Sequence, residues 1–580
     1  MNGNWSLDAL YPSYDSPAYQ ADVAQLEATL QSLGQLELLD ELTTIRTVIS
    51  QIETINVLAH RLFAFSHLQL ATNTSDSESL QRQAYLSRLM ATHAKTIAQI
   101  DRFLGNCTTD ITQDDTLKHY TFAFQQFKQQ AQYLLSDEVE EVLSLLNQSA
   151  GDAWENLQSY LTSTIEGEFD GKPITLSEIR NLAYDADPSV RQRAYEQELA
   201  MYQTIKEPIA FALNNIKSQV NDISKLRGFS SPLEATLIQS RMSQATLDAL
   251  LAAIEESLPA FRRYLKHKAH LLGHENGLPF YDLFAPIGQA STRTFSAEEA
   301  KDYLIEHFSK FSDDLAEMTR EFFEQDYIDL YPRKGKVGGA FCSNLPFIKQ
   351  SRVLMNFDGS LRNVVTLAHE LGHAYHGLHI EEHAPLNRHY TMPVAETAST
   401  FNENLIMSSI IKEASDAEKI SLLESEIQDT TQLIVDIYSR YLFESSVFSA
   451  RQERFMFANE LEELMLDAQR QAYGDGLDQS ALHPYMWLCK GHYYSTGLSF
   501  YNFPYAFGGL FAKGLYAKYQ AEPNGFVANY QAMLHATTVS TVEETGRTMG
   551  IDLTKKEFWA LALQQIEQQI DEFIRLTSQN

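Results

Sequence analysis

Cysteine is scarce in this sequence. The chain of 580 residues holds only three, Cys107, Cys342 and Cys489. They are far apart and lack the close spacing of a cysteine metal site. A low cysteine content is typical of reducing compartments, where structural disulfides do not persist. Residues 1–8 are polar and acidic and show no signal-peptide pattern, so we expect a cytoplasmic protein without structural disulfides.

Positive charge and long apolar runs are lacking as well. Lys and Arg number 45 against 76 Asp and Glu, which gives a formal net charge of -31 at pH 7 and an isoelectric point near 4.9. This excess of negative charge argues against nucleic acids and anionic membrane surfaces as partners. No uninterrupted apolar run reaches the length that spans a membrane. With 44% hydrophobic residues, the chain can still bury a sizeable core.

Most of the sequence up to residue 270 predicts long amphipathic helices. Apolar residues recur at positions i, i+3, i+4 and i+7, a spacing that places them on one helix face. The pattern covers residues 17–33, 39–71, 76–104 and 115–146. Helical patterns resume from Pro393 and continue to the C-terminus. Apolar stripes of this kind are typical of a helical core, so the sequence predicts a mostly α fold.

Two interruptions divide the helical region. Residues 161–176 have β-favouring flanks around Asp170-Gly171, a pair that favours the tight turn of a β-hairpin. Residues 185–188, which read Asp-Ala-Asp-Pro, then interrupt the helical pattern. We therefore predict an N-terminal helical domain over residues 1–200, which contains the hairpin, and a catalytic domain over residues 201–580.

The most specific motif in the sequence is His369-Glu370-Leu371-Gly372-His373. Two His at i and i+4 share one helix face, where two neutral imidazoles can bind one Zn2+ ion. Glu370 lies to the side of this pair, where it can take a proton from an attacking water without ligating the metal. Apolar residues at helical spacing around the motif predict a mostly buried helix. Buried His and Glu side chains require partners, and a metal ion supplies them.

A catalytic zinc site usually has three protein ligands and one open position. His379 has the spacing seen in peptidases with three His ligands. Those peptidases need a glycine where this chain has His376, because the helix must break there, and Gly377 comes one residue too late. If the helix continues, His379 lies roughly 15 Å along its axis from His369. This distance argues against His379 as a ligand of the same ion.

Glu396 is the third ligand that we prefer. Pro393 suits the first turn of a helix on which Glu396, Ser399 and Glu403 share one stripe. A carboxylate on a second helix can complete a His-His-Glu site, and Glu403 can hydrogen-bond a ligand His from outside the metal. The alternative interpretation is a Glu that merely benefits from the helix dipole. We predict that His369, His373 and Glu396 hold a single Zn2+ ion.

Strand-forming residues directly precede the zinc helix, over 334–348 and 353–357. An exposed strand edge there can pair with the backbone of an extended peptide. Glycine permits close backbone approach, so we assign Gly338, Gly339 and Ala340 to substrate binding. The alternative is a small sheet that only supports the zinc helix.

The segments that hold these residues resemble a known family. Thr366–His376, followed by Glu396-x-x-Ser399-x-x-x-Glu403, is similar to the oligoendopeptidase F branch of the thimet oligopeptidase family of zinc metallopeptidases. The similarity extends to residues 5–12, 227–234, 336–342 and 500–505. One departure is Asn363, where many relatives have Asp. The resemblance implies zinc, an all-helical fold around a deep channel, and cleavage of short peptides rather than folded proteins.

A second cluster of aromatic residues and His lies between positions 483 and 511, interspersed with glycines. Aromatic density usually indicates a core, but this many glycines are unusual for a plain helix. Tyr hydroxyls and a His N–H are suited to stabilise the oxyanion that forms when water attacks a peptide carbonyl, and one such donor contributes roughly 3 kcal/mol. The resemblance places substrate-binding His and Tyr in this region. We assign His492, with Tyr501 or Tyr505, to this role.

These patterns predict a zinc metalloendopeptidase that hydrolyses internal bonds of short oligopeptides, with Glu370 as the general base. The fold that we expect is a large, mostly α, two-lobed peptidase with a deep central cleft or channel and a small β-sheet beside the zinc helix. Two alternatives are a zinc hydrolase that acts on a non-peptide amide and a peptide-binding protein without catalysis. The intact His, Glu, His and downstream Glu argue against the second alternative. The expected partners are short peptides, and the oligomeric state stays open.

Overall fold

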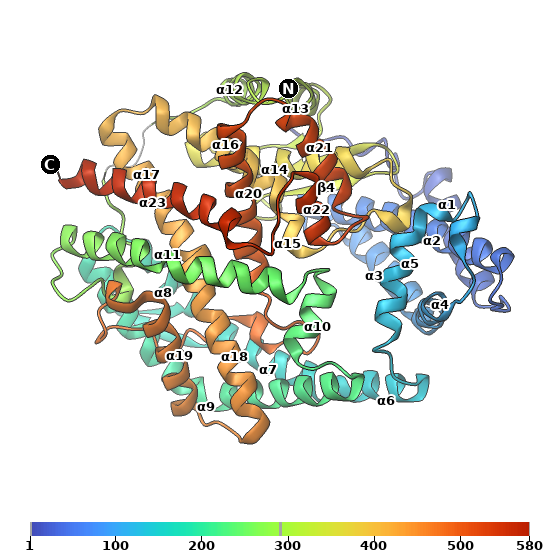
Figure 1. The fold of residues 1–580 in the computed structure, drawn as a ribbon, viewed down its shortest axis with the longest axis horizontal. Coiled ribbons are helices and arrows are strands. Elements are labelled where there is room, and N and C mark those ends of the chain that lie inside the picture. Colours follow the sequence, from blue (N-terminus) through green and yellow to red (C-terminus); the bar gives the residue numbers. More distant parts are fainter. Residues whose placement is uncertain (1–2, 289–292, 579–580) are drawn as a thin grey trace. The chain divides into compact units, whose positions relative to one another are not determined.

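The structure, a computed structural model, describes residues 3–288 and 293–578. It is mostly α-helical and has two small β-sheets (Figure 1). This confirms the predicted fold class. In the described part of the chain, no helix combines the length and the apolar character needed to cross a membrane.

The chain folds into two compact units, each built from three separate segments. The first unit comprises Met1–Leu134, Thr292–Ser409 and Tyr519–Gly550, and the second comprises Leu135–Ser291, Ile410–Lys518 and Ile551–Asn580. The predicted division at residue 200 does not coincide with these units. Helix α9 (Pro188–Arg227) begins at the stretch 185–188, because Asp187 caps the helix and Pro188 occupies its first turn. The helix then continues through residue 200. The Asp-Ala-Asp-Pro stretch therefore begins a long helix rather than separating two domains.

The N-terminal helices of the first unit follow the predicted periodicity. They are α1 (Pro17–Leu33), α2 (Leu42–Thr72), α3 (Ser77–Thr92), α4 (Ala94–Asn106) and α5 (Thr121–Ala131). The apolar faces of α1 and α2 meet in a core that includes Leu26, Leu30 and Leu62, all fully buried. The predicted segment 76–104 forms two helices, because His93 leaves the helical conformation. The predicted segment 115–146 is also divided, into α5 and α6 (Asp137–Asn147).

A three-stranded sheet in the first unit precedes the helix with the metal motif. Strands β3 (Ile328–Asp329), β4 (Phe341–Leu345) and β5 (Gln350–Leu354) have the order β3-β5-β4. β4 pairs antiparallel with β5, from Phe341 opposite Leu354 to Leu345 opposite Gln350, and β3 pairs parallel with β5. β4 is therefore an edge strand within the described residues. Helix α14 (Leu361–Ile380) packs against β4 and β5.

The other helices of the first unit lie before and after α14 in the sequence. They are α12 (Ala297–Ser309), α13 (Asp313–Glu324), α15 (Met392–Ala395), α16 (Thr397–Glu413), α21 (Phe526–Ala536) and α22 (Val542–Thr548). Of these, α12, α13 and α21 contact α14. Tyr375 of α14 donates to Asp314 of α13, and Gln531 of α21 donates to the same carboxylate. This network connects α14 to two other helices through one half-buried acidic group.

The second unit contains the predicted hairpin and a helical bundle. Strands β1 (Glu166–Phe169) and β2 (Lys172–Thr175) pair antiparallel. Asp170 and Gly171 have φ of 50° and 77°, the positive values that a two-residue hairpin turn requires. The hairpin therefore lies where the sequence predicts it.

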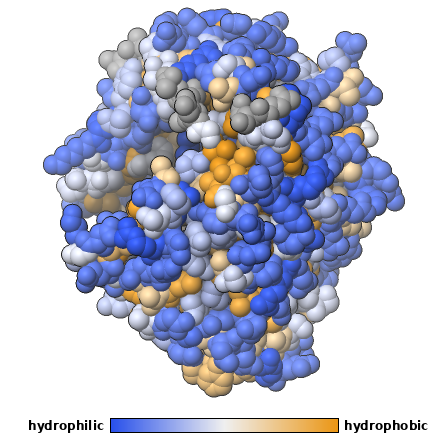
Figure 2. All heavy atoms as spheres, turned by 90° about the vertical axis from the view of Figure 1, so that its left-hand side faces the viewer, coloured by the Kyte–Doolittle hydropathy of each residue, from blue (hydrophilic) through white to orange (hydrophobic). Residues whose placement is uncertain are grey.

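The helices of this unit that follow α6 are mostly long. They are α7 (Gly151–Thr164), α8 (Leu176–Asn181), α9, α10 (Pro232–Gln239), α11 (Gln244–Leu271), α17 (Asp416–Thr431), α18 (Ile437–Glu453), α19 (Ala458–Tyr473), α20 (Phe503–Ala521) and α23 (Lys556–Ser578). A π-helical turn, η6 (Gln432–Asp436), joins α17 to α18. On the face drawn in Figure 2 most residues are hydrophilic, in keeping with the acidic composition.

Candidate metal centre

Local sequence chemistry determines where α14 begins. Ser360 caps the helix by accepting a hydrogen bond from the backbone N–H of Asn363. Gly359 has φ of 86°, and a Cβ at this position would lie 2.8 Å from the carbonyl oxygen of Phe295. Asn363 Oδ1 accepts a 2.6 Å hydrogen bond from the N–H of Asp358. The amide at position 363 thus supplies the acceptor that an Asp would also supply, so this departure from the family pattern leaves the helix start intact.

Three side chains of the first unit bring nitrogen and oxygen atoms together at one point. His373 Nε2 lies 3.2 Å from His369 Nε2. Glu396 Oε2 lies 3.4 Å from His369 Nε2 and 3.3 Å from His373 Nε2. These residues are the one group of three or more His, Cys, Asp or Glu among the described residues whose geometry suits a metal ion.

The dimensions of this triangle fit zinc. Zn–N and Zn–O bonds of about 2.0–2.2 Å at tetrahedral angles separate two ligand atoms by roughly 3.3–3.5 Å. The observed separations of 3.2–3.4 Å are close to these values. Two imidazoles and one carboxylate also form a ligand set that zinc enzymes use. The residues present could therefore hold a single zinc ion.

Two further hydrogen bonds orient two of the three side chains. Glu403 Oε1 lies 2.8 Å from His369 Nδ1, and a carboxylate can only accept, so Nδ1 carries the proton. The other nitrogen, Nε2, then points toward His373 and Glu396. Ser399 donates to Glu396 Oε2 at 2.8 Å. Contacts of this kind outside the ligand set hold metal ligands in position.

The electrostatics of the site reflect its concentration of carboxylates. Burial lowers the pKa of His369, but the hydrogen bond to Glu403 and the nearby carboxylates outweigh it and raise the pKa to about 9. Burial raises the pKa of Glu396, but the hydrogen bond from His373 and the charge of His369 bring it down to about 2. The site therefore favours positive charge at its centre, the sign that a metal ion carries.

Glu370 lies between the two His on the same helix and is only 6% exposed. It is not one of the three residues whose donor atoms converge. Burial raises the pKa of its carboxyl group, and the charges of His369 and His373 partly oppose this rise. Its position beside the pair and outside the triangle matches the one that the sequence predicts.

Close packing of α14 against α16 brings Glu396 and Glu403 to the His pair. A Cβ at Gly372 would lie 2.5 Å from the carbonyl oxygen of Ala398 and from Ser399 Cα, so only glycine permits this approach. Asn402 of α16 donates to the carbonyl of Ala368 on α14 at 3.3 Å. The sequence offers no signal for the role of Asn402, because an amide in a helix is compatible with many environments.

The helix that the sequence predicts from Pro393 is divided at the ligand itself. Pro393 lies in the first turn of α15, and Glu396 then leaves the helical conformation with φ of −92° and ψ of 6° before α16 begins at Thr397. Glu396, Ser399 and Glu403 nevertheless lie on one side, because the N–H of Thr400 still bonds to the carbonyl of Glu396 as in a continuous helix. Glu396 thus lies at the junction of two helices rather than inside one.

The competing His residues on α14 do not take part in the triangle. α14 is unbroken to Ile380, so His379 lies about 15 Å along the axis from His369. Its ring packs edge-on against Tyr375. His376 is fully buried, stacks on Tyr390 with ring centroids 4.4 Å apart, and lies 2.8 Å from Thr537 Oγ1.

The sheet beside α14 anchors the helix as well as offering an edge. Asn344 of β4 donates to the carbonyl of His373 at 3.4 Å and accepts from Ser351 at 2.8 Å. A Cβ at Gly377 would lie 2.4 Å from Asn344 Oδ1. Gly377 therefore permits the approach of β4 instead of breaking the helix. Reasoning from the sequence missed Asn344, for which a polar residue in an apolar strand is the only available signal.

The residues assigned to substrate binding precede β4. Gly339 has φ of 77°, and its carbonyl accepts from Asn356 Nδ2 at 2.8 Å. A Cβ at Gly338 or Gly339 would meet no atom within 4 Å among the described residues. The space above this backbone is therefore open, as close approach of another chain requires. The assignment of Gly338, Gly339 and Ala340 to peptide binding stays a prediction.

The second predicted cluster belongs to the second unit. His492 lies in the short 3-10 helix η8 (Gly491–Tyr494), and burial together with the positive charge of Arg440 lowers its pKa to about 3. The rings of Tyr501 and Tyr505 pack edge to face with centroids 5.3 Å apart. Tyr505 is 37% exposed. Their assignment to the oxyanion stays a prediction.

Known proteins are similar to this chain over almost its whole length. Residues 181–565 match peptidase family M3, and residues 109–166 match a family described as oligopeptidase F. The chain is 22% identical to the oligopeptidase PepF of Bacillus subtilis, over 99% of this chain and 87% of that protein. It is 23% identical to an oligoendopeptidase F homolog of Lactococcus lactis, over 99% of this chain and 97% of that protein.

Two crystal structures share the fold. A putative peptidase of Chlamydophila abortus matches with a TM-score of 0.87 at 21% identity, covering 99% of this chain and 98% of that one. The oligoendopeptidase F of Enterococcus faecium matches with a TM-score of 0.73 at 19% identity, covering 97% of this chain and 99% of that one. The family match spans more than half of the sequence and includes the His-Glu-x-x-His helix. This chain belongs to peptidase family M3 and is a peptidase.

Proposed function

We propose that this peptidase is a zinc-dependent endopeptidase that hydrolyses internal bonds of short oligopeptides. The observation that carries the proposal is the triangle of His369, His373 and Glu396, with ligand atoms 3.2–3.4 Å apart. Buried Glu370 beside this triangle adds a group that can accept a proton. The names of the relatives, oligopeptidase and oligoendopeptidase F, support short peptides as the substrate class.

In this mechanism His369, His373 and Glu396 hold the ion, while Glu403 and Ser399 keep two of these side chains in position. A bound zinc ion polarises the scissile carbonyl and lowers the pKa of water at the site. The Glu370 carboxylate takes a proton from the attacking water and passes it to the departing amine nitrogen. His492, with Tyr501 or Tyr505, donates hydrogen bonds to the oxyanion.

The peptide substrate adds to the edge of the small sheet. β4 has a neighbour on one side only within the described residues, and its outer edge presents backbone N–H and C=O groups. An extended peptide can pair with such an edge, which provides affinity without strong selection of side chains. Gly338, Gly339 and Ala340 lead into this strand and leave room for the substrate backbone.

A comparison of wild type with Glu370→Gln tests the proposal. Zinc content is measured by mass spectrometry of the purified proteins, and turnover is measured with fluorescence-quenched peptides whose ends are blocked. We expect the variant to retain one zinc ion per chain and to lose roughly 10²- to 10⁴-fold in kcat, as expected on removal of a general base. Glu382→Gln, at an exposed site just beyond α14, is the matched control and should turn over like wild type.

Four results would count against the proposal. Wild-type turnover by Glu370→Gln would show that Glu370 is not the general base. Bound zinc without turnover of any peptide would favour a peptide-binding protein, and turnover of amides but not peptides would favour a different hydrolase. Turnover of the same peptides with free ends, but not with blocked ends, would contradict the endopeptidase assignment.

A further inference from the structure

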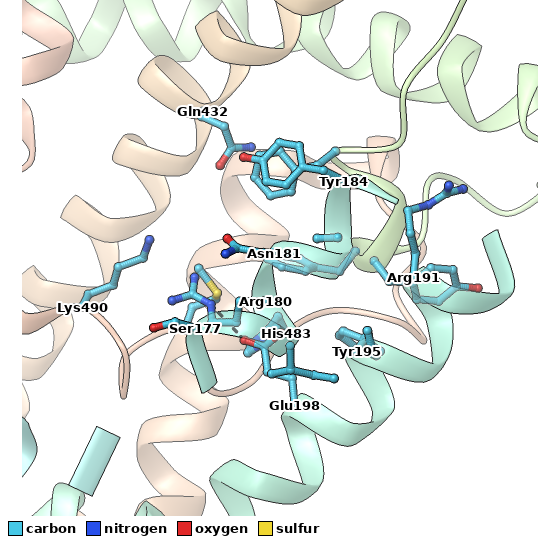
Figure 3. Close-up of a pocket in the computed structure, with 17 residues that line it drawn as sticks. Ser177, Arg180, Asn181, Tyr184, Arg191, Tyr195, Glu198, Gln432, His483 and Lys490 are labelled. Atoms are coloured by element: carbon cyan, nitrogen blue, oxygen red, sulfur yellow. Dashed lines mark ion pairs between the residues drawn. The ribbon is translucent and has the colours of Figure 1, made fainter. Parts of the chain in front are cut away.

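The second unit contains a cavity of about 390 Å³ that the proposed peptidase mechanism does not use. It lies between α8, the beginning of α9, residues 280–284, the π-helical turn η6 and the segment from His483 to Lys490 (Figure 3). Its volume is within the range of cavities that bind small organic molecules. The residues that line it include both aromatic and charged side chains.

One side of the cavity is aromatic. Tyr184 and Phe284 pack with ring centroids 4.8 Å apart, and Tyr195 and Tyr281 pack at 5.6 Å. Tyr195 Oη donates to the carbonyl of Leu482 at 2.6 Å, which holds its ring in place. This side offers flat apolar surface to a ligand.

One charged group of the lining, Arg191, is already paired with a carboxylate behind it. Arg191 and Asp282 form a 2.7 Å ion pair and are 2% and 1% exposed. Arg191 also donates to the backbone carbonyl of Asp185 at 2.6 Å. The charge of this arginine is therefore neutralised within the protein.

A single carboxylate serves two basic groups next to the aromatic residues. Glu198 Oε1 lies 3.2 Å from Arg180 Nε and 3.4 Å from His483 Nε2. His483 Nδ1 accepts from the backbone N–H of Tyr485 at 3.2 Å, so in the neutral ring Nε2 carries the proton and faces Glu198. The negative charge of Glu198 offsets the positive charge of Arg180, so it does not neutralise a further cation.

Lys490 is the one cation of this lining without an ion pair among the described residues. Within the described residues its ammonium group has no hydrogen-bond or ion-pair partner, and Figure 3 shows the side chain extending toward the open space of the cavity. Burial and repulsion from Arg440 lower its pKa, and the nearby carboxylate of Asp436 opposes this only in part. Gln432 Nε2 is buried and has no acceptor within 3.5 Å in the part of the chain that the structure describes, although its amide also interacts with the Tyr473 hydroxyl. A ligand that supplies oxygen acceptors and one negative charge would satisfy both groups.

We infer that this cavity binds a small organic anion, with its carboxylate or phosphate between Lys490 and Gln432 and a flat apolar group against the aromatic side. The positive cavity contrasts with a chain whose net charge is -31. Such a site is separate in composition from the metal centre, which consists of other residues in the other unit. The inference therefore does not depend on the proposed zinc chemistry.

Calorimetric titration of the full chain tests the site with defined probes. Phenyl phosphate and 3-phenylpropionate carry the anion and the ring, inorganic phosphate carries only the anion, and 3-phenylpropanol carries only the ring. We expect saturable 1:1 binding of one or both aromatic anions and much weaker binding of the alcohol. Tight binding of phenyl phosphate alone would identify a phosphate ligand, and that of 3-phenylpropionate alone a carboxylate ligand.

Substitution of the cation locates the binding. Lys490→Met should weaken binding of the anions roughly 10- to 100-fold, as expected when a charge-assisted hydrogen bond is lost, whereas Lys490→Arg should retain most of it. Lys225→Met, at an exposed position near the other end of α9, is the control and should bind like wild type. Without ligand, Lys490→Met should unfold at the same temperature as wild type or higher, because it removes a partly buried cation that forms no ion pair among the described residues.

Glu396→Ala separates this site from the metal centre, and it should bind the aromatic anions with unchanged Kd. Gln432→Leu provides a second probe of the cavity if Lys490→Met does not fold, and it too should weaken anion binding. The inference is overturned if wild type binds none of the anions more tightly than 3-phenylpropanol. It is also overturned if Lys490→Met and Gln432→Leu bind as tightly as wild type, or if Glu396→Ala abolishes binding.

Discussion

His369 of α14 donates through Nδ1 to Glu403 of α16 across 2.8 Å. The two residues are 34 positions apart in sequence, and the bond connects the helix that holds the His pair to the helix that follows Glu396. A carboxylate accepts but cannot donate when ionised, so the proton stays on Nδ1 whether or not a metal is bound. This arrangement leaves Nε2 as the ligand atom and fixes the direction in which it points.

Removal of Glu403 should weaken metal binding although all three ligands remain. Partners that hydrogen-bond a ligand His typically contribute 10- to 100-fold to metal affinity, so we expect a loss of this size for Glu403→Ala. Competition for zinc with a fluorescent chelator measures it. Glu317→Ala, whose side chain is 72% exposed, is the control. An unchanged affinity in Glu403→Ala would show that the bond to His369 does not support the site.

Replacement of the proposed third ligand should remove zinc altogether. Glu396→Ala leaves two imidazoles, which do not hold zinc tightly, whereas His379→Ala leaves the triangle intact. After dialysis against a weak chelator, elemental analysis should find zinc in His379→Ala but not in Glu396→Ala. The opposite result would make His379 a ligand, which would require α14 to bend or unwind after His373.

Gly372→Ala should destabilise the first unit, because its Cβ would lie 2.5 Å from the backbone of Ala398 and Ser399. Overpacking of this kind costs about 1–3 kcal/mol of unfolding free energy, and the displaced α16 should also hold zinc less tightly. Urea unfolding and zinc content measure the two effects. Gly34→Ala is the matched control, because its nearest contacts at 3.5–3.7 Å are ordinary. Equal stability of both variants would contradict the close packing of α14 and α16.

His492 should make the protein less stable in acid. Its pKa falls from 6.5 to about 3 in the folded chain, so below pH 6.5 the unfolded state binds a proton that the folded state does not. The contribution of His492 to the free energy of unfolding is complete above pH 6.5 and declines as the pH falls toward 3. The decline between pH 7 and pH 5 is about 2 kcal/mol. His492→Asn should lose less stability over this interval in urea unfolding. His270→Asn, an exposed control on α11, should behave like wild type, and identical pH profiles for all three proteins would contradict the low pKa.

Much of the fold and part of the site could be predicted because they depend on local patterns. The apolar periodicity of residues 17–33 reproduces α1, and Asp170-Gly171 forms a hairpin turn because both residues tolerate positive φ. The interruption at Pro188 was misleading, because Pro in a first turn begins a helix as readily as it separates two helices. A sequence pattern marks where a helix begins but does not show whether a domain ends there.

The sequence by itself determined the His pair and its Glu, since the spacing of 369, 370 and 373 follows from helix geometry alone. It also identified Glu396 and Glu403 as candidates. Only the tertiary structure decided that their oxygens reach the imidazoles, because that depends on Gly372 and Asn402 bringing α16 against α14. The cavity around Lys490 is likewise a tertiary feature, since its charges come from segments about 300 residues apart. Local spacing is encoded in neighbouring residues, whereas the meeting of distant side chains depends on the packing of the whole unit.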